Sequence, residues 1–271
     1  MQGFAKARVL AIANRKGGTG KSTAVVNLGA EFAARGYRVL IVDLDPQGHA
    51  GFGLGIWSGP GAVTSHSALR ERQPILGRGV KPSPEPRLDI LPADRDFDGT
   101  VRVQDPRCLA KALDPLRVAY DIVLIDTPPA SANVLTCALM AAEGVVVPTA
   151  LEHLSLDGVR QFARSYDDLM LSLNAALLGL VILPMRVDLR SKVQKHVLDD
   201  LTRTFGLAQV AGGVRSDMAV SEAFGRHQPL RRYKRRARAV ADFAHVADDV
   251  IRRFACRELD FGTDRAFGSA G

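Results

Sequence analysis

Cysteine is scarce in this 271-residue sequence, and the three that occur, Cys108, Cys137 and Cys256, form no CxxC pair. A disulfide framework or a cysteine-bound zinc site therefore has no support in the sequence. The six histidines are scattered along the chain, which argues against a histidine metal site. We interpret the cysteines as core thiols of a protein in a reducing compartment.

Long hydrophobic runs are absent as well. The first 14 residues lack the apolar stretch of a signal peptide, and the longest apolar region, around 139–151, is interrupted by Glu143 and Pro148. We therefore expect no membrane span, no export signal and a cytoplasmic location. The composition, 46% hydrophobic and 24% charged, is that of a globular protein, and the length suits one large domain.

Acidic residues are missing from the segment 226–238, which carries seven lysines and arginines. The formal net charge of the whole chain is +7, so the rest of the chain is about neutral. A concentrated positive patch on a balanced background indicates a polyanionic partner. The alternative is an ordinary solvated helix face.

Short apolar runs alternate with longer helical patterns along the chain. The expected strands are 8–13, 38–43, 88–91, 121–126, 144–148 and 179–183, and the expected helices are 21–35, 107–119, 132–142, 155–173, 190–205 and 239–256. Continuous β-branched runs fit strands that are buried on both faces, so we predict an α/β fold with a doubly wound, mostly parallel sheet flanked by helices. The segment 57–86 is rich in glycine, proline and serine and is the most loop-like part. We expect one domain over 1–259 and a disordered tail over 260–271.

A phosphate-binding loop is predicted between the first strand and the first helix, in the stretch 14–23, NRKGGTGKST. At such a junction, backbone N–H groups and the helix N-terminus can hold a polyphosphate, and glycines let the backbone approach it. Lys21 can contact the β- and γ-oxygens, and Ser22 can hold Mg²⁺ through its hydroxyl. The predicted nucleotide-binding residues are Lys16, Gly17, Gly18, Thr19, Gly20, Lys21, Ser22 and Thr23. The alternative is a glycine-rich turn with no ligand.

Acidic side chains follow two of the expected strands, in VLIVDLDPQ and DIVLIDTPP. Because a nucleotide site needs acids for the metal and for water, these strand ends are its natural location. Asp126 is predicted to bind Mg²⁺ through water, and Asp45 to orient the attacking water. Asp43 could belong to the metal site, or it could only hold the loop by hydrogen bonds. The predicted metal-binding residues are Ser22, Asp43 and Asp126.

Together, KGGTGKST, VDLDPQGHA and VLIDTPPA resemble the deviant Walker A ATPases of the ParA/MinD family, and the resemblance continues through PTALEHLSLDGV and VRSDMAVSEAF to about residue 254. One departure is Arg15, which stands where the phosphate-binding motif has its first glycine. The resemblance implies a P-loop NTPase fold, ATP and Mg²⁺ as cofactors, and a weak ATPase activity that a partner stimulates.

The resemblance also implies roles for single residues. Lys16 would reach across a two-fold interface to the ATP of a partner subunit, so that the homodimer depends on ATP. Loss of Asp45 would block hydrolysis, and residues 126–129 would form a switch loop. The catalytic residues implied in this way are Lys16, Lys21 and Asp45.

The basic segment corresponds to the region in which ParA proteins carry residues that bind DNA non-specifically. Arg236 and Arg238 match basic positions of the family and Arg215 lies near another, whereas Ala219 occupies a place where the family usually has arginine. The predicted DNA-binding residues are Arg215, Arg231, Arg232, Lys234, Arg235, Arg236 and Arg238.

The branch of the family that fits these features is the ParA type, similar to Soj, without an N-terminal helix-turn-helix domain because the first strand begins by Arg8. The resemblance thus implies a nucleoid-associated partition ATPase that binds non-specific double-stranded DNA and a ParB-like centromere-binding partner. The alternative is a MinD-like or cargo-positioning ATPase that acts on a membrane or a protein complex. Apolar spacing between Phe243 and Phe254 fits either a helix packed on the sheet or a membrane-binding helix.

Overall fold

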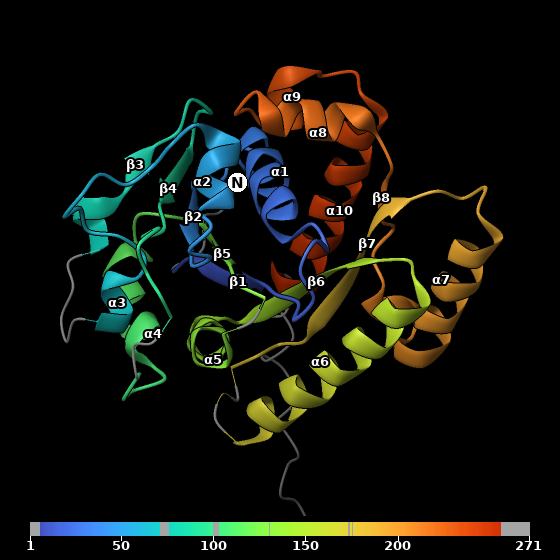
Figure 1. Ribbon diagram of the computed structural model, residues 1–271, viewed down its shortest axis with the longest axis horizontal. Coiled ribbons are helices and arrows are strands. Elements are labelled where there is room, and N and C mark those ends of the chain that lie inside the picture. The colour runs from blue at the N-terminus through green and yellow to red at the C-terminus, as the bar shows by residue number, and fades with distance from the viewer. Residues whose placement is uncertain are drawn as a thin grey trace, which may run out of the picture.

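The computed structural model describes residues 6–70, 76–99, 103–129, 131–172, 174 and 176–255 (Figure 1). The predicted tail, 260–271, and Cys256 lie outside these residues.

The centre of the molecule is an eight-stranded sheet with the order β3-β4-β2-β5-β1-β6-β7-β8. Its strands are β1 (Arg8–Ile12), β2 (Val39–Asp43), β3 (Lys81–Pro82), β4 (Leu88–Leu91), β5 (Ile122–Asp126), β6 (Gly144–Ala150), β7 (Leu180–Val187) and β8 (Val214–Arg215). Every pairing is parallel except that of the edge strand β3, which runs antiparallel to β4. The predicted doubly wound, mostly parallel sheet is confirmed.

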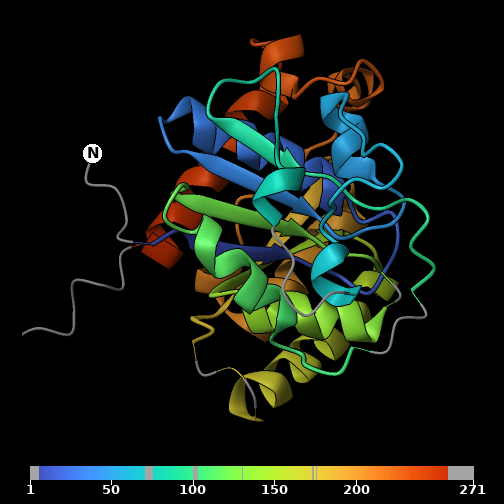
Figure 2. The same ribbon diagram turned by 90° about the vertical axis from the view of Figure 1, so that its left-hand side faces the viewer.

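Helices cover both faces of the sheet. They are α1 (Lys21–Ala34), α2 (His49–Leu54), α3 (Ser67–Arg70), α4 (Cys108–Leu113), α5 (Ala132–Ala141), α6 (His153–Ser172), α7 (Lys192–Phe205), α8 (Met218–Gly225), α9 (Leu230–Tyr233) and α10 (Arg238–Ala255), with short 3₁₀ helices at Leu76–Gly79, Asp114–Leu116 and Leu207–Gln209. One hydrophobic core lies between the sheet and α1, α2, α8, α9 and α10, and the cores on the opposite face involve α3 to α7. Figure 2 shows these layers from the side.

The central strand β1 explains why the apolar runs in the sequence are continuous. Leu10 and Ile12 pack into the core under α1 and α10, whereas Val9 and Ala11 pack into the cores of the opposite face. Since successive side chains of a strand alternate between faces, a strand covered on both sides needs an apolar residue at every position. The strand ends are in register, because Asp126 of β5 lies opposite Ile12 of β1 on one side and Asp43 of β2 on the other. The loop after β1 and both acids therefore share one edge of the sheet.

The apolar face of α10 is part of the core. Phe243, Val246, Val250 and Phe254 are each at most 4% exposed. Of the two interpretations of this helix, the contacts therefore favour packing on the sheet. No helix in the described ranges is both long and apolar enough to cross a membrane.

The loop-like segment 57–86 contains α3, the 3₁₀ helix Leu76–Gly79 and β3 within its described residues, and the structure buries four of its polar residues, Thr64, Ser65, His66 and Ser67. Ser65 donates a hydrogen bond to the carbonyl oxygen of Asp43. The ring of His66 stacks on Phe97 with centroids 4.1 Å apart, accepts a hydrogen bond from the backbone N–H of Asp94 at Nδ1 (3.0 Å), and has Nε2 3.2 Å from the carbonyl oxygen of Leu44. These bonds hold the end of β2 in place.

The buried imidazole of His66 makes stability depend on pH. Burial lowers the pKa of His66 from 6.5 to about 4, so between these values the unfolded chain binds a proton that the folded chain does not. This contribution to the free energy of unfolding is complete above pH 6.5 and is lost as the pH falls, by about 2 kcal/mol at pH 5. We expect the stability difference between the wild type and His66→Gln, measured by urea unfolding, to shrink by that amount from pH 7 to pH 5.

The comparison with a variant is needed because Asp43 acts in the opposite sense. Its burial raises its pKa to about 7, so the folded state binds the extra proton and this contribution to stability falls as the pH rises from about 4 to 7. Asp43 is present in both proteins, and its effect cancels in the difference. A difference that stays constant between pH 7 and pH 5 would show that His66 does not titrate in this way.

Candidate functional site

The loop between β1 and α1 has the backbone shape of a phosphate cradle. Gly18 and Gly20 adopt positive φ angles of 71° and 93°, a region that side chains disfavour. Gly20 also caps α1 without any side-chain hydrogen bond, so the first N–H groups of α1 receive no cap from it. A Cβ added at Gly17 or Gly18 would meet no atom within 4 Å. The loop therefore borders open space, as a bound phosphate chain requires.

Lys21 points back into this loop. Its side chain is almost buried, with the residue 7% exposed, and Nζ donates to the carbonyl oxygen of Lys16 at 3.3 Å. Burial lowers the pKa of Lys21, while the nearby carboxylates of Asp126 and Asp45 act to raise it. The ammonium group is thus held where a phosphate would meet it, close to the two acids that were predicted to serve the metal and the water.

Asp126 ends β5 and is fully buried, and neither of its carboxylate oxygens accepts a hydrogen bond. Burial raises its pKa well above the usual value, and the charge of Asp43 adds to the rise. Ser22 and Lys21 lie close enough to offset part of it, although the Ser22 hydroxyl does not meet hydrogen-bond geometry. A buried carboxylate without a partner is costly unless a cation binds it. The pair Ser22 and Asp126 therefore fits a Mg²⁺ ion bound with a nucleotide.

Asp43 has a different environment, since both of its oxygens are already used. Oδ1 accepts from the backbone N–H of Asp45 at 3.2 Å, and Oδ2 accepts from that of Gly51 at 3.0 Å. These contacts support the alternative in which Asp43 holds the loop, and its role at the metal stays a prediction. Asp45 lies in that loop, is 7% exposed, and accepts from the N–H of Gln47 at 3.0 Å. Within the described residues, no group of three or more acids, histidines or cysteines could hold a metal by itself, so phosphate and water oxygens would complete the coordination.

Lys16, the second lysine of the loop, turns away from it toward the start of α6. Nζ lies 3.0 Å from Glu152 Oε2 and 3.3 Å from Ser155 Oγ, and the Lys16 side chain is 40% exposed. An exposed ion pair of this kind contributes little, so it can be exchanged for another partner. The loop backbone is fixed separately, because Asn14 accepts from the Lys16 N–H and donates to Pro148. Sequence reasoning missed Glu152 and Ser155.

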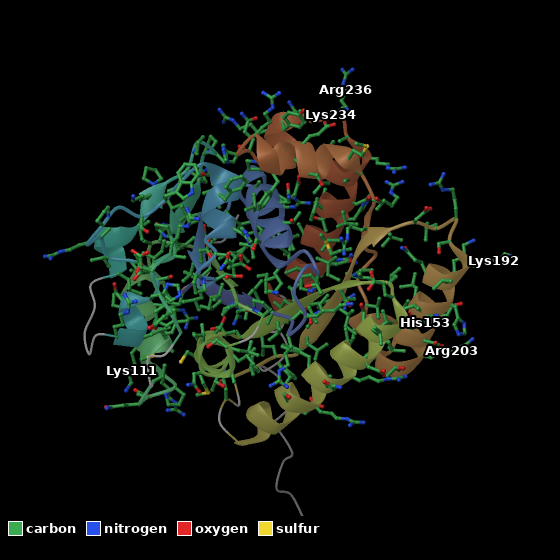
Figure 3. All side chains as sticks on the ribbon, viewed as in Figure 1. Lys111, His153, Lys192, Arg203, Lys234 and Arg236 are labelled. Carbon is green, nitrogen blue, oxygen red and sulfur yellow. The ribbon has the colours of Figure 1, made fainter. Side chains whose placement is uncertain are left out.

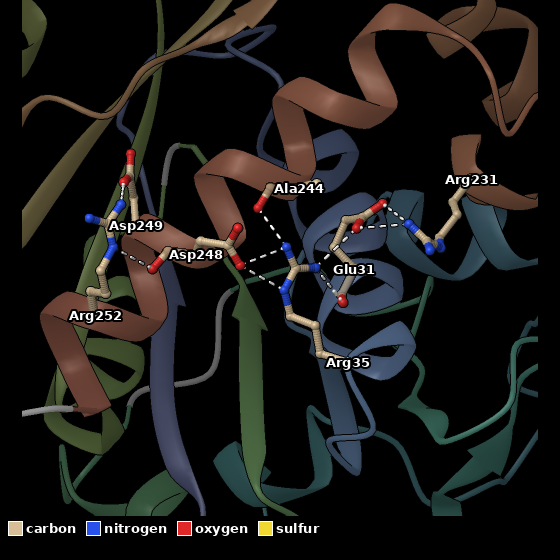
Figure 4. Close-up of polar contacts among 7 residues, drawn as sticks. All are labelled: Glu31, Arg35, Arg231, Ala244, Asp248, Asp249 and Arg252. Carbon is tan, nitrogen blue, oxygen red and sulfur yellow. Dashed lines mark hydrogen bonds and ion pairs between the residues drawn. The ribbon is translucent and has the colours of Figure 1, made fainter. Parts of the chain in front are cut away.

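The basic segment is not a uniform patch, because acids from distant parts of the chain neutralise some of its residues. Figure 4 shows Arg231 paired with Glu31 of α1, at 3.1 Å. Glu31 is only 2% exposed and also binds Arg35, which reaches Asp248 of α10. Arg231 therefore joins the basic segment to the nucleotide-binding helix and is part of the internal structure.

Three more of the predicted DNA-binding residues are held in the same way. Arg215 pairs with Asp242 at 2.6 Å, Arg232 donates to the carbonyl oxygen of Pro84 at 2.8 Å with Glu85 nearby, and Arg238 donates to the carbonyl oxygen of Ser216 and faces Asp217. The lack of acids within the segment therefore does not mean a lack of acids around it. Of the seven cations in the segment, Arg231, Arg232 and Arg238 have acidic partners in the folded chain.

The other predicted residues, Lys234, Arg235 and Arg236, are exposed between α9 and α10. Their side chains make no hydrogen bond or ion pair with any residue that the structure describes. Figure 3 shows Lys234 and Arg236 projecting away from the body of the protein. Arg226 at the start of the segment is likewise exposed and has no ion pair with a described residue. Lys234, Arg235 and Arg236 are consecutive, and we call these three the unpaired basic cluster.

Comparison with known proteins agrees with this geometry. A family model described as an AAA domain matches residues 7–178. The chain is 37% identical over 256 residues to the chromosome partitioning protein ParA of Caulobacter vibrioides, covering 91% of this chain and 94% of that protein. It is 39% identical over 204 residues to the chromosome-partitioning ATPase Soj of Thermus thermophilus, covering 74% and 78%.

A solved structure with the same fold is cobyrinic acid a,c-diamide synthase from Mycobacterium smegmatis with a bound ATP analogue and magnesium, at 30% identity and a TM-score of 0.80, covering 93% of this chain and 96% of that one. The motifs, the sheet and the matched length thus lead to the same conclusion as the sequence resemblance. The chain belongs to the ParA/MinD family of P-loop ATPases.

Proposed function

We propose that this protein is an ATP-dependent DNA partition ATPase. An ATP-bound dimer binds double-stranded DNA without sequence preference, and hydrolysis stimulated by a ParB-like partner releases it. The observation that carries the DNA part of the proposal is the unpaired basic cluster, because it offers three exposed cations with no partner in the described part of the chain. The ParA and Soj relatives, which are partitioning proteins by name, support the same conclusion.

In this proposal, each residue of the nucleotide site has a distinct role. Lys21 and the N–H groups of the loop would hold the β- and γ-phosphates of ATP, and Ser22 and Asp126 would hold a Mg²⁺ ion that offsets their charge. Asp45 orients the attacking water. Lys16 leaves Glu152 and reaches the nucleotide of the partner subunit, where its charge stabilises the transferring phosphoryl group. ATP is then part of the dimer interface, and its hydrolysis weakens the dimer.

The DNA interaction is electrostatic and rests on counterion release. Lys234, Arg235 and Arg236 lose no internal ion pair when they contact phosphates, whereas Arg231 would have to abandon the buried Glu31. Two protomers with three unpaired cations each could neutralise six phosphates. The slope of log affinity against log salt would then be about −5.

The competing function, a MinD-like or cargo-positioning ATPase, has less support. The apolar face of α10 is buried in the core and is therefore not available for a membrane unless the helix leaves the sheet. Positioning of a protein complex would use the same ATPase cycle with another cargo, and it is an outcome of the experiment below.

The test is DNA binding by the purified protein with ATP, ADP or no nucleotide, on two unrelated sequences. We expect binding only with ATP and equally on both sequences. Replacement of Lys234, Arg235 and Arg236 by alanine should weaken it by about 100-fold or more and remove most of the salt dependence, because the cations that release counterions are gone. Fluorescence anisotropy over a salt series measures both effects.

A matched control removes three exposed cations, Lys192, Lys195 and Arg203, from α7, a helix that lies away from α9 (Figure 1). This variant has the same net charge and should bind DNA nearly as well as the wild type. Equal loss in both variants would indicate only a general charge effect. If the wild type binds no DNA with any nucleotide, the DNA proposal is wrong and the cargo is a protein assembly or a membrane instead.

A further inference from the structure

Two cysteines that are 29 positions apart in the sequence lie side by side in the fold. Cys108 is the first residue of α4 and Cys137 lies in α5, and their Sγ atoms are 3.9 Å apart. A disulfide requires a separation of about 2.05 Å, so the two sulfurs need to approach by about 2 Å. Because α4 packs directly against α5, side-chain rotation with a small helix shift can supply this movement.

The two thiols differ in a way that suits sequential oxidation. Cys108 is half-buried and can be reached from solvent, whereas Cys137 is 1% exposed in the core formed with α3, α4 and α5. In the structure the Cys108 thiol donates a hydrogen bond to the Cys137 sulfur. Once Cys108 has lost its proton, the Cys137 thiol can donate to the thiolate instead, and this interaction lowers the pKa of Cys108 and raises that of Cys137. The nearby Asp105 opposes deprotonation of Cys108, but it is itself paired with Lys111 at 2.8 Å. The accessible sulfur is therefore the better nucleophile of the two.

We propose that Cys108 and Cys137 form a reversible oxidation site, in which a peroxide converts the two thiols to a disulfide that links α4 to α5. The Cys108 thiolate attacks one oxygen of hydrogen peroxide, the O–O bond breaks, and the products are a sulfenic acid and hydroxide, which takes up a proton. Cys137 sulfur then attacks Cys108 sulfur, the S–O bond breaks, and water leaves with the thiol proton. Two thiols and one peroxide thus give one disulfide and two waters.

The position of the pair suggests what the link would do. Residues 127–131 connect Asp126 directly to α5, whose first turn is capped by Ser131. Thr127 is tied by its N–H and its hydroxyl to the carbonyl oxygen of Ile12, at the start of the phosphate-binding loop. If the chain is an ATPase as proposed above, a disulfide that restrains α5 would hinder movement of the segment that follows the metal-binding acid, and turnover would slow.

The experiment uses the full-length Cys256→Ser variant, so that no third thiol can take part. After treatment with hydrogen peroxide, neither of the two remaining cysteines should react with a maleimide under denaturing conditions. The intact mass should fall by about 2 Da, the mass of two hydrogens. Dithiothreitol should reverse both changes. When Cys137 is also replaced by serine, dimedone should instead trap a sulfenic acid on Cys108. Two reactive thiols that persist in the peroxide-treated protein would overturn the proposal.

ATP turnover is measured in the same samples, with Cys108→Ser/Cys256→Ser as the matched control that cannot form the link. Oxidation that slows ATP turnover by Cys256→Ser but not by the control supports the restraint on α5. Equal turnover rates of oxidised and reduced Cys256→Ser overturn it. If reduced protein hydrolyses no ATP at all, the proposed function fails, while the thiol and mass measurements still decide the oxidation site.

Discussion

Replacement of Lys21 by alanine should abolish nucleotide binding. Lys21 places a nearly buried ammonium group beside Asp126 and Asp45, and without it the phosphates would face carboxylates with no cation from the chain to separate them. Removing one member of a desolvated charge pair typically costs 2–5 kcal/mol, or about 30- to 5,000-fold in affinity. Isothermal titration with Mg²⁺ and ATP measures this loss.

A second lysine variant makes the result specific. Lys6 is exposed, and its one ion pair among the described residues is with Asp114 at the surface. Lys6→Ala therefore removes the same charge without touching the loop and should bind ATP normally. Circular dichroism of both variants checks that they are folded. An isotherm for Lys21→Ala that matches the wild type would refute the phosphate-binding loop.

Replacement of Asp45 should separate nucleotide binding from turnover. Asp45 does not follow the strand directly but lies in the loop after it, where its carboxylate can orient water without being needed to hold the metal. We expect Asp45→Ala to keep ATP binding, dimer formation and DNA binding, and to lose hydrolysis by about 100-fold or more, as expected when a group that positions or accepts a proton is removed. Phosphate release under saturating ATP measures the rate.

The structure also offers a conservative partner for this variant. Asp45 Oδ1 accepts a hydrogen bond from the Gln47 N–H, so alanine could disturb the loop as well as the chemistry. Asp45→Asn keeps an acceptor for that bond but cannot take a proton. Loss of turnover in both variants places the effect in the chemistry, whereas normal hydrolysis by Asp45→Asn would exclude Asp45 as a proton acceptor.

The larger elements of the fold were predictable from the sequence because each has its own pattern. The strands β1, β2, β4, β5, β6 and β7 consist mostly of apolar residues, and in the long helices apolar residues recur with the helical period. The strands β3 and β8 have two residues each, too few for any pattern, and they exist only because a neighbouring strand pairs with them. The short helices α2, α3, α8 and α9, which have four to eight residues each, fall outside the predicted helices because they are too short to show a clear helical period.

The nucleotide site was predictable in outline because strand ends converge at one edge of a parallel sheet. A loop after β1 and an acid after β5 must then be neighbours, whatever the rest of the chain does. The contacts that distinguish individual residues were not predictable. Asp43 turned out to have both oxygens bonded to the backbone, and Lys16 to rest on Glu152, 136 positions away.

The sequence by itself determined the order of the motifs, the type of sheet and the number of charges in the basic segment, since these follow from covalent order and local periodicity. Only the tertiary structure decided which charges are available, because the acid that neutralises Arg231 is Glu31, 200 positions earlier in the chain. It likewise decided that Cys108 and Cys137 meet. Ion pairs and thiol contacts act over a few ångströms, so they depend on which helices pack together and not on separation along the chain.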